Sequence, residues 1–270
     1  MRKQGMNMNK LLISNDKIFL VESDEKVLLE VDDNNKFLDV QNVKIKICEN
    51  TDLIIESNIF DKKIDICVNV LEGVCANIYE LKKGDNYKFQ YKYYLEENSY
   101  LNVEKINDVN NILEMTVINL NGEKARIDYN LKTISNSLEK YNFLVYHNAN
   151  KTVSYINNNG VNISDGSLEF NVSSFVPNNI KKCDVNQSGR IINNTDNTCT
   201  IKPNLFIDEE DVVANHSALI GTFSFDEIFY LMSRGISKKD SEMLLTKGFL
   251  FKGINYHKEE LEEIINKYWR

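Results

Sequence analysis

The sequence predicts a mainly β protein: a solenoid of stacked β-coils followed by a small α-helical segment at the C-terminus. From about residue 10 to residue 206, short segments alternate apolar and polar residues, which is the period of a strand with one buried face. Asn and Asp clusters separate these segments, and Asn suits tight corners because it tolerates the left-handed region. After Gly221 the pattern becomes helical. These three observations together indicate a long β body with a helical tail.

The strand-like segments follow one another with no helix-length pattern between them. In chain order they include residues 17–23, 26–31, 36–40, 43–47, 52–57, 63–70, 87–94, 113–120, 125–131 and 152–156. Roughly twenty short strands of this kind exceed an ordinary sandwich, whereas a solenoid needs corners at regular intervals. The sequence has no strict repeat, so a large sandwich or barrel remains the alternative from the pattern alone.

Three helices are predicted after the strands. Ser224 and Glu227 form the signature of a capping box, and an i, i+3, i+4, i+7 apolar stripe follows from Phe225 to Met232. Gly235 is expected to end this first helix. Ser237 can cap the second helix, and Gly248 is expected to end it.

The third helix is expected over residues 257–268, with Leu261, Ile264 and Ile265 facing inward and the acidic run 259–263 facing outward. The predicted domains are therefore a β body over residues 1–222 and a helical subdomain over residues 223–270. A tail of this size is too small for a strong core of its own. It is expected to pack on the β body, on a partner, or on both.

Composition excludes several classes of protein. The 270 residues include 40 acidic and 32 basic side chains, and a net charge of −8 argues against a nucleic-acid binder. No apolar run is long enough to span a membrane, and the N-terminus lacks the apolar region of a secretory signal. We expect a soluble, cytoplasmic protein.

The five cysteines include no C-x-x-C pair, and burial is the expectation for Cys67 and Cys75.

The histidines are the first candidates for chemistry, because the sequence contains no P-loop, dinucleotide-binding turn, nucleophile elbow or H-E-x-x-H helix. His147 is expected at the surface at a strand end, and His257 is expected to be solvated near the start of the last helix. His216 follows the four acids of residues 208–211, and imidazole with carboxylates can ligate iron or zinc. A surface acidic turn beside a packed histidine is the simpler interpretation of that spacing.

The segment YKFQYKYY places Tyr87, Phe89, Tyr91 and Tyr93 on one strand face, with lysines on the other. A stacking platform for single-stranded nucleic acid would use such aromatic side chains. In an acidic chain, an aromatic strand packed against its neighbours is the favoured interpretation.

Residues 201–250 resemble the SufB/SufD family, the scaffold subunits of the Suf iron–sulfur cluster assembly machinery. The resemblance rests on Lys202-Pro203, the acid run, His216-x-Ala218-x-Ile220-Gly221, and Phe229-Tyr230-Leu231-x-Ser233-Arg234-Gly235. It implies a right-handed parallel β-helix whose C-terminal helices dock the ATPase subunit SufC. It also implies a non-catalytic chain, since SufC would supply ATP hydrolysis.

Further expectations follow from the resemblance. The chain would pair through its β-helix with a SufB-like subunit or with itself, would hold an iron–sulfur cluster transiently, and would meet the cysteine desulfurase system only indirectly. A flavin would belong to the complex as a whole. The implied docking residues for SufC are Phe225, Phe229, Tyr230, Met232 and Arg234. No nucleic acid or membrane is expected as a partner.

The branch of the family is indicated by two departures. Ser188 stands where SufB carries its cluster-ligating cysteine, and Ser217 stands where SufB carries a Glu after the histidine. Both favour a SufD-like chain, in a short form without the helical N-terminal domain. His216 is then the residue carried over as a cluster or metal ligand or as a proton-handling group at the subunit junction. Glu210 and Asp211 are weaker candidates.

A second hypothesis is a β-helix protein that binds or cleaves polysaccharide. It would explain a solenoid and its acidic residues, but it leaves the helical tail without a purpose. A transporter permease, which would also pair with an ATPase of this type, is excluded by the missing membrane spans.

Overall fold

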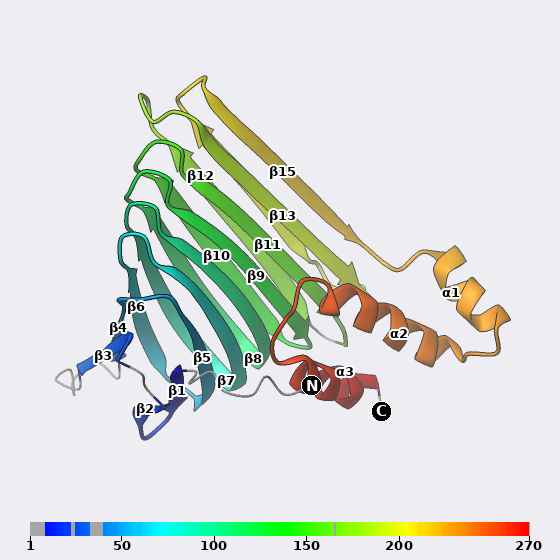
Figure 1. Ribbon diagram of the computed structural model, residues 1–270. Coiled ribbons are helices and arrows are strands. Elements are labelled where there is room, and N and C mark those ends of the chain that lie inside the picture. Colours follow the sequence, from blue (N-terminus) through cyan, green and yellow to red (C-terminus); the bar gives the residue numbers. More distant parts are fainter. Residues whose placement is uncertain (1–8, 23–24, 33–39, 165, 270) are drawn as a thin grey trace.

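The chain folds into a β-solenoid of about seven turns, with strands over 61% of its length and three helices after them. The computed structural model describes residues 9–22, 25–32, 40–164 and 166–269 (Figure 1). The predicted fold class is therefore confirmed. The strands are β1 (Asn9–Ser14), β2 (Ile18–Glu22), β3 (Val27–Asp32), β4 (Val40–Ile47), β5 (Thr51–Phe60), β6 (Lys63–Val70), β7 (Cys75–Leu95), β8 (Tyr100–Leu120), β9 (Arg126–Ser135), β10 (Leu138–His147), β11 (Val153–Asn162), β12 (Ser167–Val176), β13 (Cys183–Asn193), β14 (Thr200–Ile207) and β15 (Val212–Gly221).

The strands are fewer and longer than predicted, because β7 and β8 each continue through a corner for 21 residues. The strand expected at residues 36–40 lies outside the described residues except for Val40, where β4 begins.

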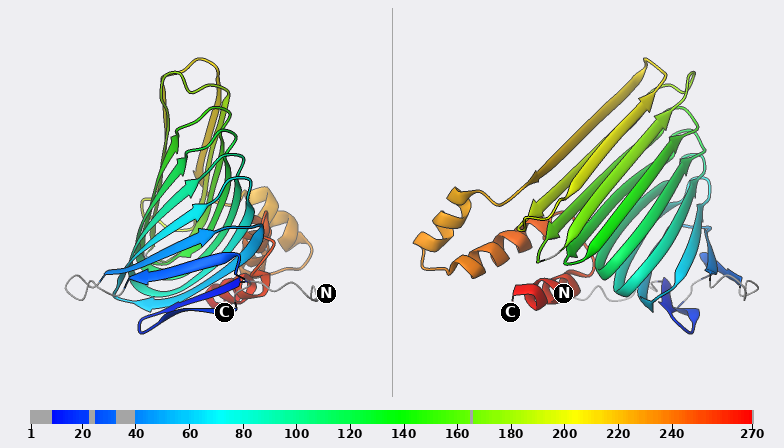
Figure 2. Two further views of the ribbon diagram at one scale, coloured as in Figure 1. Left: turned by 60° about the vertical axis from the view of Figure 1, so that its left-hand side comes forward. Right: turned by 180° about the vertical axis from the view of Figure 1, so that it is seen from behind.

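The parallel strands form two walls (Figure 2). The first wall contains β1, β5, residues 75–85 of β7, residues 100–107 of β8, and then β9, β11, β13 and β15. The second wall contains β4, β6, residues 87–95 of β7, residues 112–120 of β8, and then β10, β12 and β14. In both walls, strand residues alternate between the interior and an outer face.

Asparagine occupies corners of the solenoid, as predicted. Asn86 in β7 and Asn111 in β8 have φ values of 54° and 52°, and both mark the bend between the walls. Asn is enriched among residues that adopt this left-handed conformation. Gly84, just before the bend in β7, has a φ of 132°, and a Cβ there would lie 2.0 Å from the carbonyl oxygen of Ile59. Only glycine fits that position.

The coils lengthen along the chain, which explains why the sequence shows no strict repeat. Neighbouring residues in consecutive coils, such as Asn77 and Asn102, are 25 residues apart early in the solenoid. Asn162 and Asn193, near its end, are 31 residues apart. The added residues lie in the corners, so the paired strands keep their register while the sequence period drifts.

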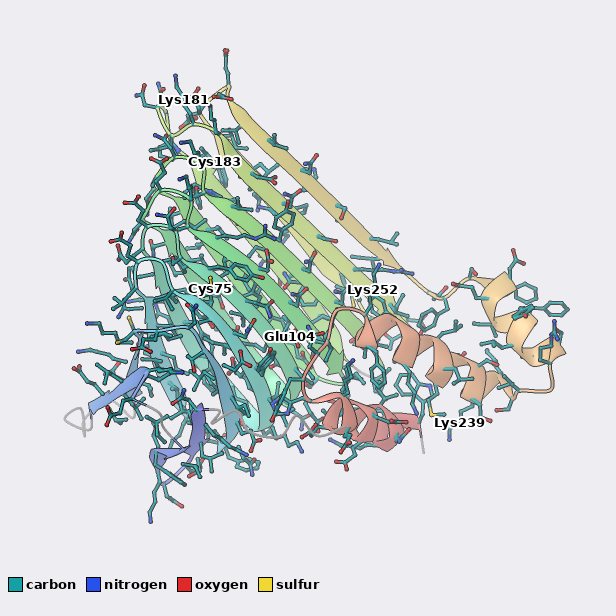
Figure 3. The ribbon with its side chains drawn as sticks, in the orientation of Figure 1. Cys75, Glu104, Lys181, Cys183, Lys239 and Lys252 are labelled. Atoms are coloured by element: carbon teal, nitrogen blue, oxygen red, sulfur yellow. The ribbon has the colours of Figure 1, made fainter. Side chains whose placement is uncertain are left out.

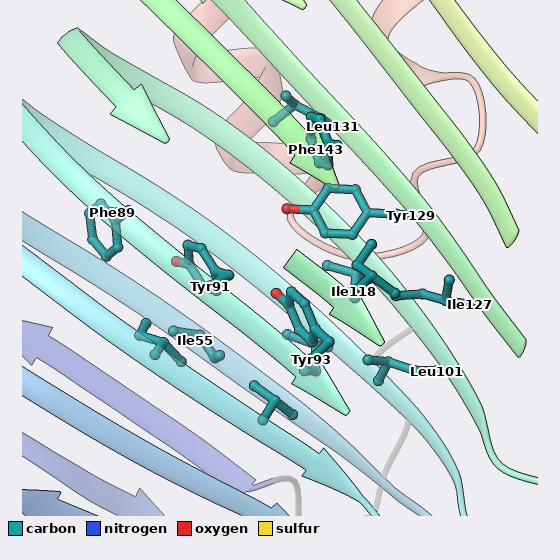
Figure 4. Packing of buried hydrophobic residues seen from close by; sticks show 14 of the residues in the cluster. Ile55, Phe89, Tyr91, Tyr93, Leu101, Ile118, Ile127, Tyr129, Leu131 and Phe143 are labelled. Atoms are coloured by element: carbon teal, nitrogen blue, oxygen red, sulfur yellow. The ribbon is translucent and has the colours of Figure 1, made fainter. Parts of the chain in front are cut away.

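The aromatic strand is packed inside the solenoid (Figure 4). Tyr91 stacks between Phe89 and Tyr93, with ring centroids 5.6 and 5.9 Å away. Tyr129 of β9 meets Tyr93 and Phe143 edge-on. All five rings are at most 2% exposed. The packed interpretation is confirmed, and no aromatic platform is available on this face for a nucleic acid.

Four charged side chains lie beside these rings at 0% exposure. Lys105 binds Glu114 at 2.9 Å and Glu80 at 3.2 Å, while Lys82 also contacts both carboxylates. The sequence pattern does not predict this buried quartet of Glu80, Lys82, Lys105 and Glu114. Because it contains equal numbers of each charge, the interior carries no net charge there.

The quartet perturbs the pKa of its members. Burial alone would raise the pKa of Glu114, but Lys105 and Lys82 bring it down to about 2. Burial would lower the pKa of Lys105, yet Glu114 and Glu80 raise it above its usual value. For Lys82 burial prevails over Glu114 and lowers the pKa to about 8. Glu114, Lys82 and Lys105 are therefore ionised at neutral pH, and the charge of Glu114 depends on the two buried ammonium groups.

The three helices are α1 (Phe225–Ser233), α2 (Lys238–Phe251) and α3 (Lys258–Trp269). The capping box of Ser224 with Glu227 is confirmed, as is the cap of Ser237 on α2. The predicted end of α2 at Gly248 is wrong. Leu250, which is fully buried, continues the helix, and Gly253, with a φ of 77°, follows its end instead. In the described part of the chain, no helix is long and apolar enough to cross a membrane.

Helices α2 and α3 pack on the outer face of the first wall (Figures 1 and 2). Leu261, Ile264 and Ile265 of α3 face inward as predicted, in a cluster with residues of β7, β8, β9, β11 and β13. The predicted packing of the tail on the β body is confirmed for these two helices. Helix α1 projects away from the solenoid in both figures and has no buried residue.

Candidate functional site

The C-terminal end of the solenoid is open. Within the described residues, β14 pairs only with β12 and β15 pairs only with β13, so each strand leaves one edge without a neighbour. Inward-facing Leu205, Ile207 and Ala214 of this last coil are only partly buried. An unpaired strand edge beside incompletely covered apolar side chains is suited to pairing with another chain.

His216 lies on the inner side of this open end. It pairs in register with Gln187 of β13, and directly neighbouring residues in parallel strands share a face. Gln187 is 3% exposed and bridges the walls, donating to Ser174 Oγ at 2.7 Å and to the carbonyl oxygen of Asn204 at 3.0 Å. His216 itself is exposed because no further coil covers it. The histidine therefore lies at the mouth of the interior.

The acidic candidates do not join His216. Glu210 and Asp211 belong to the turn between β14 and β15, and both are exposed. Asp211 precedes His216 by five residues of extended chain, which separates them by about 16 Å. The described residues contain no group of three or more His, Cys, Asp or Glu side chains that could hold a metal ion.

The two serines that depart from the SufB pattern are direct neighbours. Ser188 of β13 pairs with Ser217 of β15, and Ser217 Oγ donates to Ser188 Oγ at 3.1 Å. Both lie on the outer face of the first wall, on the opposite side of β15 from His216. Two hydroxyl groups at this place are weak ligands for iron compared with a thiolate and a carboxylate.

Helix α1 presents its apolar side chains to solvent. Phe225, Phe229, Tyr230 and Met232 are 76%, 58%, 58% and 44% exposed. The rings of Phe225 and Phe229 stack with centroids 5.7 Å apart, and the guanidinium of Arg234 lies 5.2 Å from the centroid of Tyr230. Phe225, Phe229 and Met232 follow the i, i+4, i+7 spacing of one helix face, whereas Tyr230 and Arg234 point in another direction. An exposed cluster of this kind is typical of a site for a protein partner.

Two histidine predictions are wrong. His147, expected at the surface, is fully buried, with Nδ1 2.7 Å from Thr152 Oγ1 and Nε2 2.9 Å from Ser154 Oγ. Burial lowers its pKa to about 4, against the opposing charge of Asp184. The alternation of Phe143, Val145 and His147 would have indicated an inward position.

His257, expected to be solvated, is 6% exposed and lies edge-on against the ring of Tyr256. It lies at the end of the loop before α3, between the buried residues Ile254 and Leu261 of the chain. Neither His147 nor His257 lies at the open end, so His216 is the histidine available there.

The cysteine prediction is wrong for the two residues it named. Cys75 is exposed and Cys67 is half-buried, because both occupy outward positions on their strands. Cys183 is buried, and all five thiols are free. Burial, set against the nearby Lys92 and Lys44, raises the pKa of Cys67, so this thiol is not activated.

Glu139 is a buried carboxyl group that the sequence analysis also missed. It accepts hydrogen bonds from Thr133 Oγ1 at 2.7 Å and from the hydroxyl of Tyr141 at 2.8 Å. Its other oxygen has no hydrogen-bond partner in the described chain. Burial outweighs these hydrogen bonds and raises its pKa to about 7.

We therefore expect the difference in unfolding free energy between the wild type and Glu139→Gln to depend on pH. The folded protein keeps the Glu139 proton up to a pH of about 7, whereas the unfolded chain releases it near its usual pKa of about 4.5. The contribution of Glu139 to stability is present below pH 4.5 and falls by roughly 3 kcal/mol as the pH rises to 7. Urea unfolding of both proteins from pH 4.5 to 8 measures this, and a constant difference would contradict it.

Comparisons with known proteins agree on one family. The family described as "SUF system FeS cluster assembly, SufBD core domain" matches residues 68–249, more than half of the chain, from within β6 to within α2. The iron–sulfur cluster assembly protein SufD of Bacillus subtilis (strain 168) is 31% identical over 153 residues. The aligned part covers 56% of this chain and 35% of that relative, so the match spans about a third of the relative's length.

Proposed function

The chain belongs to the SufBD core family of the SUF system for FeS cluster assembly, and we propose that it acts there as a non-catalytic scaffold subunit. Two parts of the chain have a role: helix α1, which follows β15, and the open end of the solenoid, where β14 and β15 each have a free edge. Helix α1 binds the SufC-type ATPase, and the open end of the solenoid pairs with a SufB-like subunit or with a second copy. ATP hydrolysis is then supplied by the partner.

The exposed surface of α1 carries this proposal. A helix with no buried residue and four large exposed apolar side chains is unfavourable in water unless another protein covers it. Helices α2 and α3 already bury apolar side chains against the first wall, so α1 is the helix of the tail that is available to a partner. The curated relative is itself named for iron–sulfur cluster assembly.

The open end supports the second role. Pairing of β14 and β15 with strands of another chain would complete their hydrogen bonds and cover the partly buried core residues. His216 would then face the junction, where it contributes one ligand to a transient cluster or handles a proton. Because the described chain offers no complete ligand set, the remaining ligands come from the other subunit. The FeS cluster is the cargo of such a complex.

One experiment tests both roles: co-purification of the chain with the SufC-type ATPase and the SufB-like subunit of the same organism. We expect a stable complex with the wild type and its loss with Phe229→Asp/Tyr230→Asp, which places charge in the interface. Phe19→Asp is the matched control, since Phe19 is also 45% exposed but lies on β2 at the other end of the solenoid. His216→Ala should leave the complex intact and lower the amount of cluster it assembles. No complex with the wild type would refute the proposal.

A further inference from the structure

The outer face of the second wall is basic, although the chain as a whole has a net charge of −8. The charged side chains at its outward positions are mostly lysines. They are Lys44, Lys46, Lys63, Lys88, Lys92, Lys140 and Lys202, against the carboxylates Asp65 and Glu169. The charge of this face is therefore opposite in sign to the net charge of the chain.

Part of this positive charge is unpaired. Lys63 lies 3.7 Å from Asp65, and Lys140 and Lys202 share Glu169 at 3.2 and 3.4 Å. Lys44 faces Glu30 of β3 at 3.8 Å, with both side chains mostly exposed. Within the described ranges, no ion-pair partner lies near the exposed Lys46, Lys88 and Lys92. The unpaired charge therefore gathers on β4 and β7, at the early coils.

The later coils of the same face add apolar side chains beside Lys140, Glu169 and Lys202. Val117 of β8 and Leu144 of β10 are register neighbours, and Leu113 is 44% exposed. The rings of Tyr146, Phe175 and Phe206 stack along one row at 4.9 and 4.8 Å. Phe206, at the end of this row, is 52% exposed.

Because each ring of this row covers the face of the next, the row offers ring edges as an apolar ridge. It does not offer free faces for a sugar or a base. The early coils thus supply positive charge, and the later coils supply an apolar strip.

We propose that the outer face of the second wall binds an amphipathic α-helix of an acidic partner protein. The helix lies across the strands, with carboxylates over Lys88 and Lys92 and apolar side chains over Val117, Leu144 and the ring edges. The strands from β4 to β14 span about 29 Å at the usual strand spacing, which matches a helix of about 19 residues. The three helices of this chain lie on the first wall or beyond it, so they leave this face open (Figures 1 and 2).

Charge complementarity selects the partner. The unpaired ammonium groups favour Glu- or Asp-rich segments and disfavour basic ones, while the apolar strip requires a second, hydrophobic side on the same element. This surface does not include α1, and it meets the open end only at the outer face of β14, so the inference does not depend on the proposed scaffold function.

Fluorescence anisotropy of the full chain with a labelled 20-residue helical peptide tests the proposal. The probe carries Leu along one face and Glu beside it, and its counterpart has every Glu replaced by Lys. We expect the Glu probe to bind more tightly than the Lys probe and to weaken with salt. Lys88→Glu/Lys92→Glu should weaken binding of the Glu probe about tenfold, because two attractive contacts with its carboxylates become repulsive. Leu144→Glu should weaken it as well.

The matched control is Lys124→Glu/Lys258→Glu, which makes the same charge change at two exposed lysines away from this face and should leave binding unchanged. Equal binding of the two probes, or equal binding by Lys88→Glu/Lys92→Glu and its control, would overturn the proposal. A third outcome is that the chain sediments with vesicles of phosphatidylcholine and phosphatidylserine but does not bind the Glu probe. This result would overturn the proposal in favour of a lipid surface.

Discussion

Glu114→Gln should lower the free energy of unfolding by about 3–5 kcal/mol, the cost typical of removing one partner from a buried ion pair. Glu114 holds both Lys82 and Lys105, and all of these side chains are at 0% exposure. Without its charge, two ammonium groups share the single carboxylate of Glu80. Burial already lowers the pKa of Lys82 to about 8, so this lysine is expected to lose its proton in the variant.

The matched variant is Lys82→Met/Glu114→Gln, which removes one charge of each sign and leaves Lys105 paired with Glu80. We expect it to be more stable than Glu114→Gln alone, because no buried charge is left without a partner. Urea unfolding followed by the strand signal in far-ultraviolet circular dichroism measures both. A double variant as unstable as the single one would show that the loss comes from packing and not from the unpaired charge.

Glu104→Ala should release α2 and α3 from the first wall without unfolding the solenoid. Glu104 is 3% exposed, and its carboxylate accepts hydrogen bonds from the backbone amides of Asn255 and Tyr256 at 2.7 and 3.3 Å. Figure 3 labels Glu104 on the wall against which the helical tail lies. It also accepts one from the side-chain amide of Asn255. These hydrogen bonds to a charged group tie the loop before α3 to the first wall, and their loss costs about 2–4 kcal/mol locally. The stacking of Tyr79 on Tyr256 loses its support as well.

Two probes separate this local opening from global unfolding. Trp269, the single tryptophan of the chain, lies at the end of α3 and reports on the tail, whereas the strand signal reports on the solenoid. In Glu104→Ala the tryptophan transition should move to lower urea while the strand transition stays in place. Asp108→Ala is the milder control, because its partners are the 58% exposed Lys267 and the hydroxyl of Tyr268 and include no backbone amide. Coincident transitions in Glu104→Ala would contradict the expectation.

Much of the architecture could be predicted because it depends on local signals. Alternation with period two identified the β body, and Asn and Asp clusters such as the one that ends at Asn111 identified corners. The caps at Ser224 and Ser237 located two helix starts. Each of these signals lies within a few residues of the structure it determines.

What could not be predicted depends on contacts between coils. No local signal marks Glu80, Lys82 and Glu114 as buried, and they meet only because the two walls face each other across the interior. Helix α2 extends beyond Gly248 because Leu250 packs on the first wall, which is also a long-range contact. At the site, the sequence placed His216 beside the acids, but an extended strand carries the histidine away from their turn.

The connection from β15 to α1 has a mechanical consequence. Residues 222–224 join the outermost strand directly to the exposed helix, so a load that a bound protein applies to α1 is divided between β15 on one side and α2 on the other. β15 is held on one side, by the ladder that runs from Cys183–Val212 to Ile192–Gly221. A pull along the strand would strain the whole ladder at once, whereas a sideways pull would peel it from Gly221 toward His216. The direction of the load, more than its size, would decide whether the mouth of the interior opens.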